Sequence, residues 1–180
     1  RYIILILPVL AGFGLSGQTE KHLKDLRQLT FGGDNAEAYF SPDGRYASFQ
    51  SNNPGWGLGC DHIFNLHIQS AAGDSTYRPP MISNGRGRTT CSYYMPDGRH
   101  ILYASTFEAD SLCPEVPEIK GKYLWPVYAA FDIYVADLKG NIVKKLTPED
   151  GYDAEATVSP LGDKIVFTSD RSGDLELWIM

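Results

Sequence analysis

The chain has 180 residues, of which 43% are hydrophobic and 21% are charged, and its formal net charge is -6. This composition is typical of a globular protein with one sizeable core, and it is too polar for a membrane protein. The negative charge argues against a general nucleic-acid binder, which would need a basic surface. The 18 glycines, 11 prolines and 12% aromatic residues indicate many short strands separated by tight turns.

The first 17 residues have the layout of a secretory signal peptide. Arg1 precedes an apolar run over 3–15, and the small residues Ser16 and Gly17 follow it. The run is shorter than the roughly 20 apolar residues that a membrane span needs, so a retained anchor is the alternative that we disfavour. We expect cleavage near Gly17, export, no membrane span in the mature chain, and a short segment over 18–26 before the fold.

Three segments repeat one pattern, in which a strand, a proline-containing turn and a second strand follow one another; they are residues 35–49, 90–103 and 153–167. The turn residues Pro42, Pro96 and Pro160 lie 54 and 64 residues apart. Periods of this order indicate propeller blades that carry loop insertions. Proline presets the backbone of the turn and the following glycine accepts a left-handed conformation, so each segment is predicted to be a hairpin.

Each repeat also predicts two further strands. The third strand is expected at 62–68, 132–136 and 176–179, and an outer strand ending in Leu-Thr or its equivalent at 27–30, 78–83 and 144–147. Four antiparallel strands make one propeller blade. The predicted fold class is therefore all-β, an incomplete β-propeller over 27–180 with about 2.5–3 four-stranded blades. A ring needs at least four blades, so we expect further blades after Met180.

The repeats resemble those of the TolB-like propellers of the bacterial periplasm. The resemblance rests on Ser41-Pro42-Asp43-Gly44-Arg45, on the stretch 132–137, on the Leu-Thr strand ends and on 167–173, and it covers roughly residues 24 to 180. It implies a six-bladed ring in which the strand at 27–30 completes the last blade. It also implies a periplasmic protein of a Tol–Pal-type envelope system, with protein partners and without a cofactor. No partner-binding residue is transferred from the family.

Two long loops are predicted on the face opposite the Pro-Asp-Gly turns, over 51–61 and over about 105–130. Long irregular loops on a rigid scaffold often carry function. The aromatic residues of these loops are candidate anchors for a protein, peptide or sugar ligand, although they would equally serve to pack their own loops. The candidate ligand-binding residues of the loops are Trp56, Asp61, His62, Trp125 and Tyr128.

Acidic residues recur at the start of the inner strands, where they would face the mouth of the central channel: Asp34, Glu37, Asp153 and Glu155. An acidic rim would attract a cation or a basic peptide. The interpretation that we favour is local hydrogen bonding to the loop backbone. Glu37 and Glu155 are nevertheless retained as candidate binding residues.

The three cysteines, Cys60, Cys91 and Cys113, all map to the long-loop face. In an oxidising compartment two of them should form a disulfide that fixes a long loop. Cys91 is the preferred partner because it lies between the other two, but the sequence leaves the connectivity open. A metal site built from Cys60, Cys91 and His62 lacks the usual ligand spacing, so no metal is predicted.

No catalytic motif stands out: there is no Gly-x-Ser-x-Gly, no His-Glu-x-x-His and no phosphate-binding glycine loop before a helix. We therefore predict a non-catalytic propeller of the cell envelope that binds a protein or other ligand through its long-loop face. The alternative is the propeller portion of an exported peptidase or other hydrolase whose catalytic domain follows Met180.

Overall fold

The computed structural model describes residues 22–118, 121 and 126–180, so the predicted signal peptide at 1–17 lies outside the described residues. The regular secondary structure of the described residues is nearly all strand, with one 3-10 turn and one short helix. In chain order the elements are β1 (Asn35–Phe40), β2 (Tyr46–Ser51), η1 (Pro54–Trp56), β3 (His62–His67), α1 (Ile68–Ala71), β4 (Thr89–Tyr94), β5 (His100–Ser105), β6 (Asp132–Asp137), β7 (Ile142–Lys145), β8 (Asp153–Val158), β9 (Ile165–Ser169) and β10 (Glu176–Ile179).

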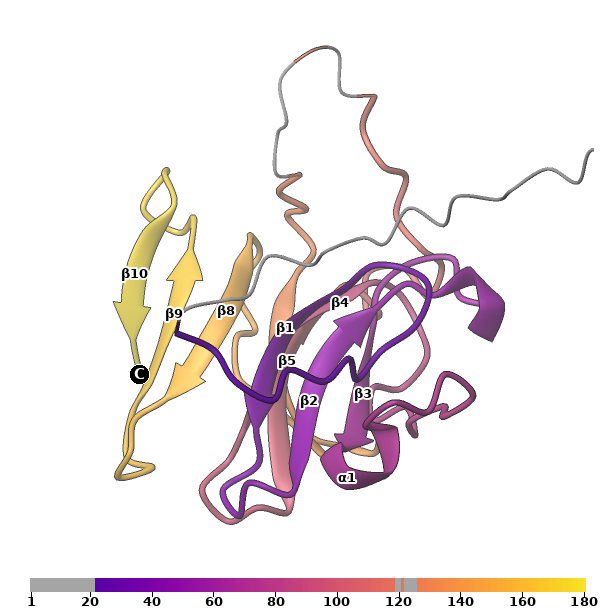
Figure 1. The fold of residues 1–180 in the computed structure, drawn as a ribbon. Coiled ribbons are helices and arrows are strands. Elements are labelled where there is room, and N and C mark those ends of the chain that lie inside the picture. Colours follow the sequence, from indigo (N-terminus) through magenta and orange to yellow (C-terminus); the bar gives the residue numbers. More distant parts are fainter. Residues whose placement is uncertain (1–21, 119–120, 122–125) are drawn as a thin grey trace, which may run out of the picture.

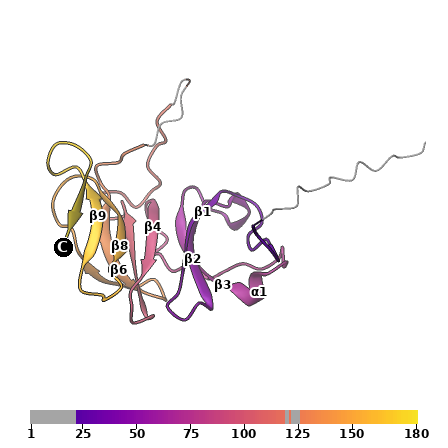
Figure 2. The same cartoon turned by 60° about the vertical axis from the view of Figure 1, so that its left-hand side comes forward.

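The strands form three antiparallel sheets, ordered β1-β2-β3, β4-β5-β6-β7 and β8-β9-β10. The sheets stand side by side, with the second between the first and the third, and they do not close into a ring (Figures 1 and 2). The predicted fold class, a partial β-propeller, is confirmed. Within the described ranges, no helix combines the length and the apolar character needed to cross a membrane.

The hairpin turns form as the sequence predicts. In the first turn the Gly44 nitrogen donates to the Ser41 carbonyl oxygen at 2.8 Å, with Gly44 at φ +69°. The third copy departs from the Pro-Asp-Gly pattern but keeps the hairpin. There, the hydroxyl of Ser159 donates to the Asp163 carboxylate at 2.7 Å, as that of Ser41 does to Asp43 in the first turn.

The turns also set how closely successive sheets approach each other. A Cβ atom added to Gly98 would lie 4.0 Å from the Pro42 ring, and one added to Gly162 would lie 3.0 Å from the Pro96 ring. The turn proline of one sheet therefore lies against the turn glycine of the next. Above these turns, apolar side chains fill the space between neighbouring sheets: Ile63, Ile82, Ile101, Tyr103 and Ala136 in one cluster, and Leu102, Ile133, Ala156, Val158 and Phe167 in another.

The outer strands differ most from the prediction. Residues 27–30 are not a strand; the Gln28 carbonyl accepts from Gly73 at 3.2 Å, and Leu29 packs against the core of the first sheet. Residues 78–83 contribute only one bridge, between Met81 and Phe64. The two prolines in that segment lack the N–H that a ladder requires. The first sheet consequently has three strands, and only the second has four.

Each inner strand carries a bulge at the same repeat position. Glu37, Cys91 and Glu155 have φ values of +52°, +48° and +51°, and the register with the neighbouring strand shifts at each. A left-handed conformation is unfavourable for residues other than glycine. Because the bulge occurs in all three sheets, it belongs to the repeat, and it brings three equivalent side chains to the inner edge of the propeller.

Candidate functional site

Each sheet contributes the residue just before its inner strand to one cavity. These residues are Asp34, Arg88 and Tyr152, and the cavity has a volume of about 210 Å³. It lies on the long-loop face, and we call it the mouth cavity. Its other lining residues are Gln50, Asn52, Asp61, Thr90, Pro126, Tyr128 and Phe131.

Arg88 is the central charged group of the mouth cavity. Its Nη1 donates to the Asp61 carboxylate at 2.6 Å, and the two side chains are only 19% and 13% exposed. The guanidinium carbon lies 5.8 Å from the centre of the Tyr128 ring, and the Arg88 backbone nitrogen donates to Thr106 at 3.0 Å. Burial raises the pKa of the Asp61 carboxyl; Arg88 opposes this shift and the neighbouring Asp34 adds to it.

Two residues that line the mouth cavity each carry a buried polar atom without a hydrogen-bond partner among the described residues. These atoms are Nε of Arg88 and the hydroxyl of Tyr128. A buried donor without an acceptor is unfavourable, by about 1–3 kcal/mol for a typical group. The cavity thus holds donors that an acceptor from outside the chain would satisfy.

One wall of the mouth cavity joins two sheets through a single side chain. Oε1 of Gln50, in β2, accepts from the Thr90 hydroxyl at 2.8 Å and from the Cys91 backbone nitrogen at 3.1 Å. All three residues are buried. This side chain fixes the position of β4 relative to the first sheet at the level of the cavity.

A smaller cavity of about 100 Å³ lies along the inner strands, and we call it the axial cavity. It is lined by the three bulge residues together with Tyr39, Ser92, Ala156 and Thr157. The hydroxyls of Tyr39 and Tyr152 donate to the carboxylates of Glu37 and Glu155, respectively. The hydrogen bond to Glu37 is the largest cause that raises the pKa of Tyr39 to about 12.

The other two acidic residues at the inner strands also have protein partners. Asp153, whose side chain is 3% exposed, accepts from Arg171 at 2.9 Å. Asp34 accepts from the Asn52 amide at 3.1 Å. The partners of Asp34 and Asp153 are therefore side chains 18 residues away, where the sequence favoured bonding to the loop backbone, and the Glu37 and Glu155 side chains line the axial cavity.

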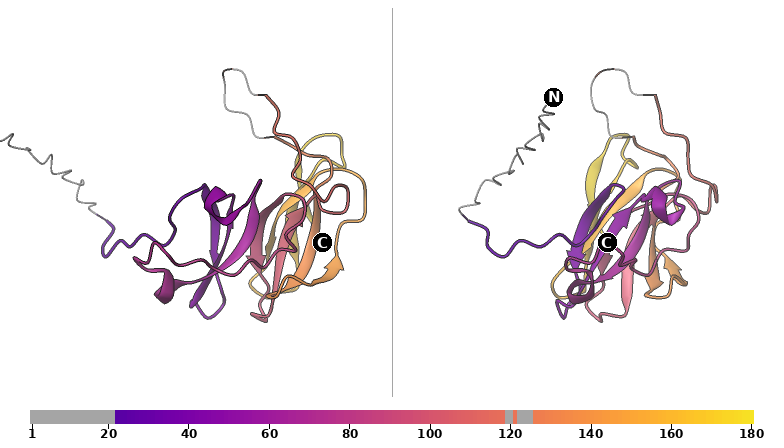
Figure 3. Two further views of the ribbon diagram at one scale, coloured as in Figure 1. Left: turned by 90° about the vertical axis from the view of Figure 1, so that its right-hand side faces the viewer. Right: turned by 45° about the vertical axis from the view of Figure 1, so that its right-hand side comes forward.

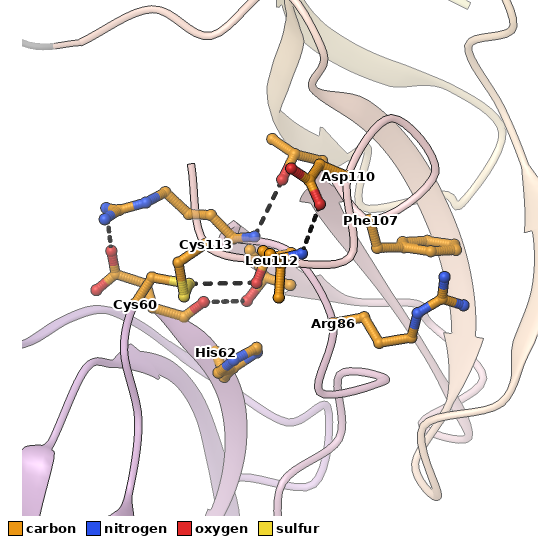
Figure 4. Close-up of a disulfide and its surroundings, with 12 residues drawn as sticks. Cys60, His62, Arg86, Phe107, Asp110, Leu112 and Cys113 are labelled. Carbon is orange, nitrogen blue, oxygen red and sulfur yellow. Dashed lines mark hydrogen bonds and ion pairs between the residues drawn. A yellow bond between two sulfur atoms is a disulfide. The ribbon is translucent and has the colours of Figure 1, made fainter. Parts of the chain in front are cut away.

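The disulfide joins Cys60 to Cys113, 53 residues apart, and so links the loop before β3 to the long loop after β5 (Figure 4). The preference for Cys91 as a partner is wrong: Cys91 is a buried free thiol. The left-handed bulge of β4 places it in the axial cavity, whereas the disulfide-bonded Cys60 sulfur lies 3.3 Å from the Gly87 carbonyl oxygen on the loop side. Burial raises the pKa of Cys91 to about 12.

This oxidation state also removes the metal alternative. A disulfide sulfur is not a thiolate ligand, so Cys60 has no role in a site with Cys91 and His62. Over the described part of the chain, no group of three or more histidine, cysteine or acidic side chains is arranged to hold a metal ion.

The other predicted site residues divide between the cavities and the loops. Asp61 and Tyr128 line the mouth cavity. Trp56 instead packs on Phe64, with 4.9 Å between ring centres, as expected if it packs its own loop. His62 is 6% exposed, and burial lowers its pKa, with a smaller contribution from nearby Arg88. Trp125 lies outside the described residues.

Sequence reasoning missed Arg88 and Gln50. The repeat alignment held a signal for Arg88, because 34, 88 and 152 are equivalent positions one residue before the inner strands. No comparable signal exists for Gln50, since its partners lie 40 and 41 residues away in another sheet.

A cavity larger than the mouth cavity, about 570 Å³, lies on the opposite face between the first two hairpin turns. Its charged side chains are already paired within their own turns. Asp43 is 2.6 Å from Arg45, and Asp97 is 2.6 Å from His100. We therefore place the candidate site at the mouth cavity, where buried donors are unpaired.

Comparison with solved structures supports this description of the fold. The structure of TolB from Acinetobacter baumannii matches with a TM-score of 0.53 and 20% sequence identity, over 82% of this chain and 29% of that chain. The fold is TolB-like. A structure assigned as TolB from Agrobacterium tumefaciens matches with a TM-score of 0.37 and 22% identity, over 82% of this chain and 58% of that chain. No protein-family model matches.

The similarity to these structures concerns the fold and covers only part of each matched protein. At 20% identity, the match to the A. baumannii protein establishes the fold alone. The chain spans less than a third of that protein and 58% of the A. tumefaciens one. What those proteins do as whole molecules therefore comes to this chain only as a proposal.

Proposed function

We propose that this chain is part of a non-catalytic periplasmic β-propeller of the cell envelope that binds a protein partner through its long-loop face. One observation carries the proposal. All three sheets contribute to the mouth cavity, and Tyr128 of the long second loop and Asp61 of the disulfide-linked first loop complete it. The TolB-like fold supports the same conclusion.

The envelope location rests on two features. The first 17 residues have the composition of a signal peptide, and a disulfide is stable in an oxidising compartment. We accordingly propose a leader over 1–17, a short segment over 18–26 and a propeller over 27–180. A Tol–Pal-type role is the finer form of this proposal.

Binding suits the geometry of the mouth better than catalysis does. Arg88 is held in an ion pair with Asp61 and so serves to recognise rather than to transfer a proton. Among the described residues, Ser83 and His62 form a serine–histidine contact, and His62 follows the mouth-lining Asp61 in the chain. The side chains of Ser83 and His62 are 3.5 Å apart and buried, away from the cavity lining. No described feature favours the hydrolase alternative.

Site-specific photo-crosslinking in cells tests the proposal. A photoreactive amino acid replaces Leu112 or Val116 in the long loop, which are 71% and 62% exposed, and, as the control, Val143 in β7, which is 58% exposed. We expect the loop positions of the full-length gene product to yield a discrete adduct with an envelope protein and the β7 position to yield none. Equal adducts at all three positions, or none in the loop, would overturn the proposal.

A further inference from the structure

The two cavities at the inner edge of the propeller carry an excess of negative charge. They lie one behind the other along β4, because Thr90 lines the mouth cavity and the next residue, Cys91, lines the axial cavity. Together they contain four carboxylates, of Asp34, Asp61, Glu37 and Glu155, but a single guanidinium, that of Arg88. Low-dielectric walls concentrate such a field, so the mouth attracts cations.

Aromatic rings add to this attraction. Tyr128, Phe131 and Tyr152 line the mouth cavity. The rings of Phe131 and Tyr152 meet edge to face, with their centres 5.9 Å apart. The face of an aromatic ring attracts an ammonium or a guanidinium, as the position of Arg88 over Tyr128 shows within the chain itself.

The unpaired polar atoms specify a second feature of the ligand. Nε of Arg88 is a donor only, and with the Tyr128 hydroxyl it is buried without a partner among the described residues. A carbonyl oxygen would satisfy them. In the axial cavity, the hydroxyl of Ser92 is likewise without a partner in the described chain, and that residue is 1% exposed. A hydroxyl oxygen there can accept from an incoming cation.

A ligand that carries a cation beside a carbonyl meets both conditions, and a peptide with a basic side chain is such a ligand. We propose that the mouth cavity takes a lysine or arginine side chain of an extended segment of the partner, with a backbone carbonyl of that segment accepting from Arg88 and Tyr128. This inference rests on the proposed function. The 210 Å³ volume is below that of a site for a drug-sized ligand and suits a single side chain. An acidic side chain in the cavity would be repelled by the Asp34 carboxylate.

Calorimetric titration of the full-length gene product with blocked tripeptides tests the inference. The peptides are acetyl-Ala-Lys-Ala-amide, its norleucine and glutamate counterparts, and butylamine as a cation without a carbonyl. We expect the lysine peptide to bind about tenfold more tightly than the norleucine peptide and than butylamine, as for one charged hydrogen-bonded contact. Raising the salt concentration from 50 to 500 mM should lower the affinity for the lysine peptide and for no other peptide, because salt screens the attraction between opposite charges.

Two conservative variants locate the site. Asp34→Asn keeps the shape of the side chain and should lower the affinity for the lysine peptide about fivefold to tenfold. Tyr128→Phe keeps the ring but removes the hydroxyl, so it should lower the affinity for the lysine peptide and leave the affinity for butylamine unchanged. Asp150→Asn is the matched control, since Asp150 is exposed and outside both cavity linings, and it should leave the affinity unchanged. Unchanged thermal midpoints confirm that the variants are folded.

The outcomes separate this inference from the proposed function. Norleucine or glutamate peptides that bind as tightly as the lysine peptide to the unaltered protein would overturn the inference, whether or not the variants fold. An affinity unaffected by Asp34→Asn would overturn it as well. If crosslinks at Leu112 and Val116 persist in that case, the protein-binding proposal stands; if they are absent too, both fail.

Discussion

Reduction of the Cys60–Cys113 disulfide should destabilise the protein by about 4 kcal/mol. The bond closes a loop of 53 residues, and the loop-closure entropy that it removes from the unfolded chain corresponds to this free energy at 25 °C. The loop contains β3, β4 and β5 and spans the boundary between the first two sheets. The bond therefore constrains how two blades separate as well as how one loop moves.

Urea unfolding of the full-length gene product, followed by circular dichroism, measures this effect. The oxidised protein is compared with the reduced protein and with the Cys60→Ser/Cys113→Ser variant, and both should lose about the same free energy of unfolding. Reductant added to the double variant is the control and should change nothing. A loss below about 1 kcal/mol in both the reduced protein and the variant would refute the entropic argument.

Three further predictions concern the scaffold and use the same unfolding assay unless stated. Gly87→Ala should lower the free energy of unfolding by about 3 kcal/mol, because a Cβ atom there would lie 2.7 Å from a backbone nitrogen. Gly73→Ala, also at positive φ but with open space around it, should cost about 1 kcal/mol; equal losses would contradict the steric reasoning. Arg171→Leu should cost about 3 kcal/mol, since its carboxylate partner is 3% exposed and would remain buried and unpaired. Arg45→Leu, in an exposed pair, should have no measurable effect, and a larger loss there than at Arg171 would be inconsistent with this. The folded pKa of Cys91, about 12, lies above the ordinary value of 9.0, so the native chain keeps a proton that the unfolded chain loses, and stability should fall as the pH rises above 9. Native Cys91 should accordingly react with iodoacetamide at pH 9 at least about 100-fold more slowly than in urea; comparable rates would show an exposed or ionised thiol.

The sequence determined the hairpins well because each depends on a local signal. Proline and glycine within a few residues of each other fix the backbone of the turn, and the alternation on either side fixes the strands. Even the third turn kept its hairpin, since the Ser159 and Asp163 side chains supply the hydrogen bond of the standard copy. The outer strand at 27–30 failed as a prediction because Leu-Thr endings indicate a strand only where an edge is available to pair with it.

The candidate site was only partly predictable. Asp61 and Tyr128 were identified because they lie in or beside the long loops and, for Tyr128, because an aromatic ring is a candidate anchor, whereas Arg88 required the repeats to be aligned one residue beyond the strand. The disulfide depended on which way each cysteine side chain faces, and Cys91, at the left-handed bulge of β4, lines the axial cavity. Contacts between sheets, such as those of Gln50, depend on the assembled propeller and have no local signal.

The contact between turn prolines and turn glycines has a consequence for how such a protein can diversify. Where Pro96 lies against Gly162, a rigid ring meets bare backbone, so the angular step from one blade to the next is fixed at that rim. At the other rim, loops of differing length connect the strands (Figure 3), and residues before the inner strands of all three sheets line the mouth cavity. Substitutions and insertions at the mouth can therefore accumulate one blade at a time while the pitch of the ring stays constant. The stiff rim preserves the architecture, and the loop rim is free to vary.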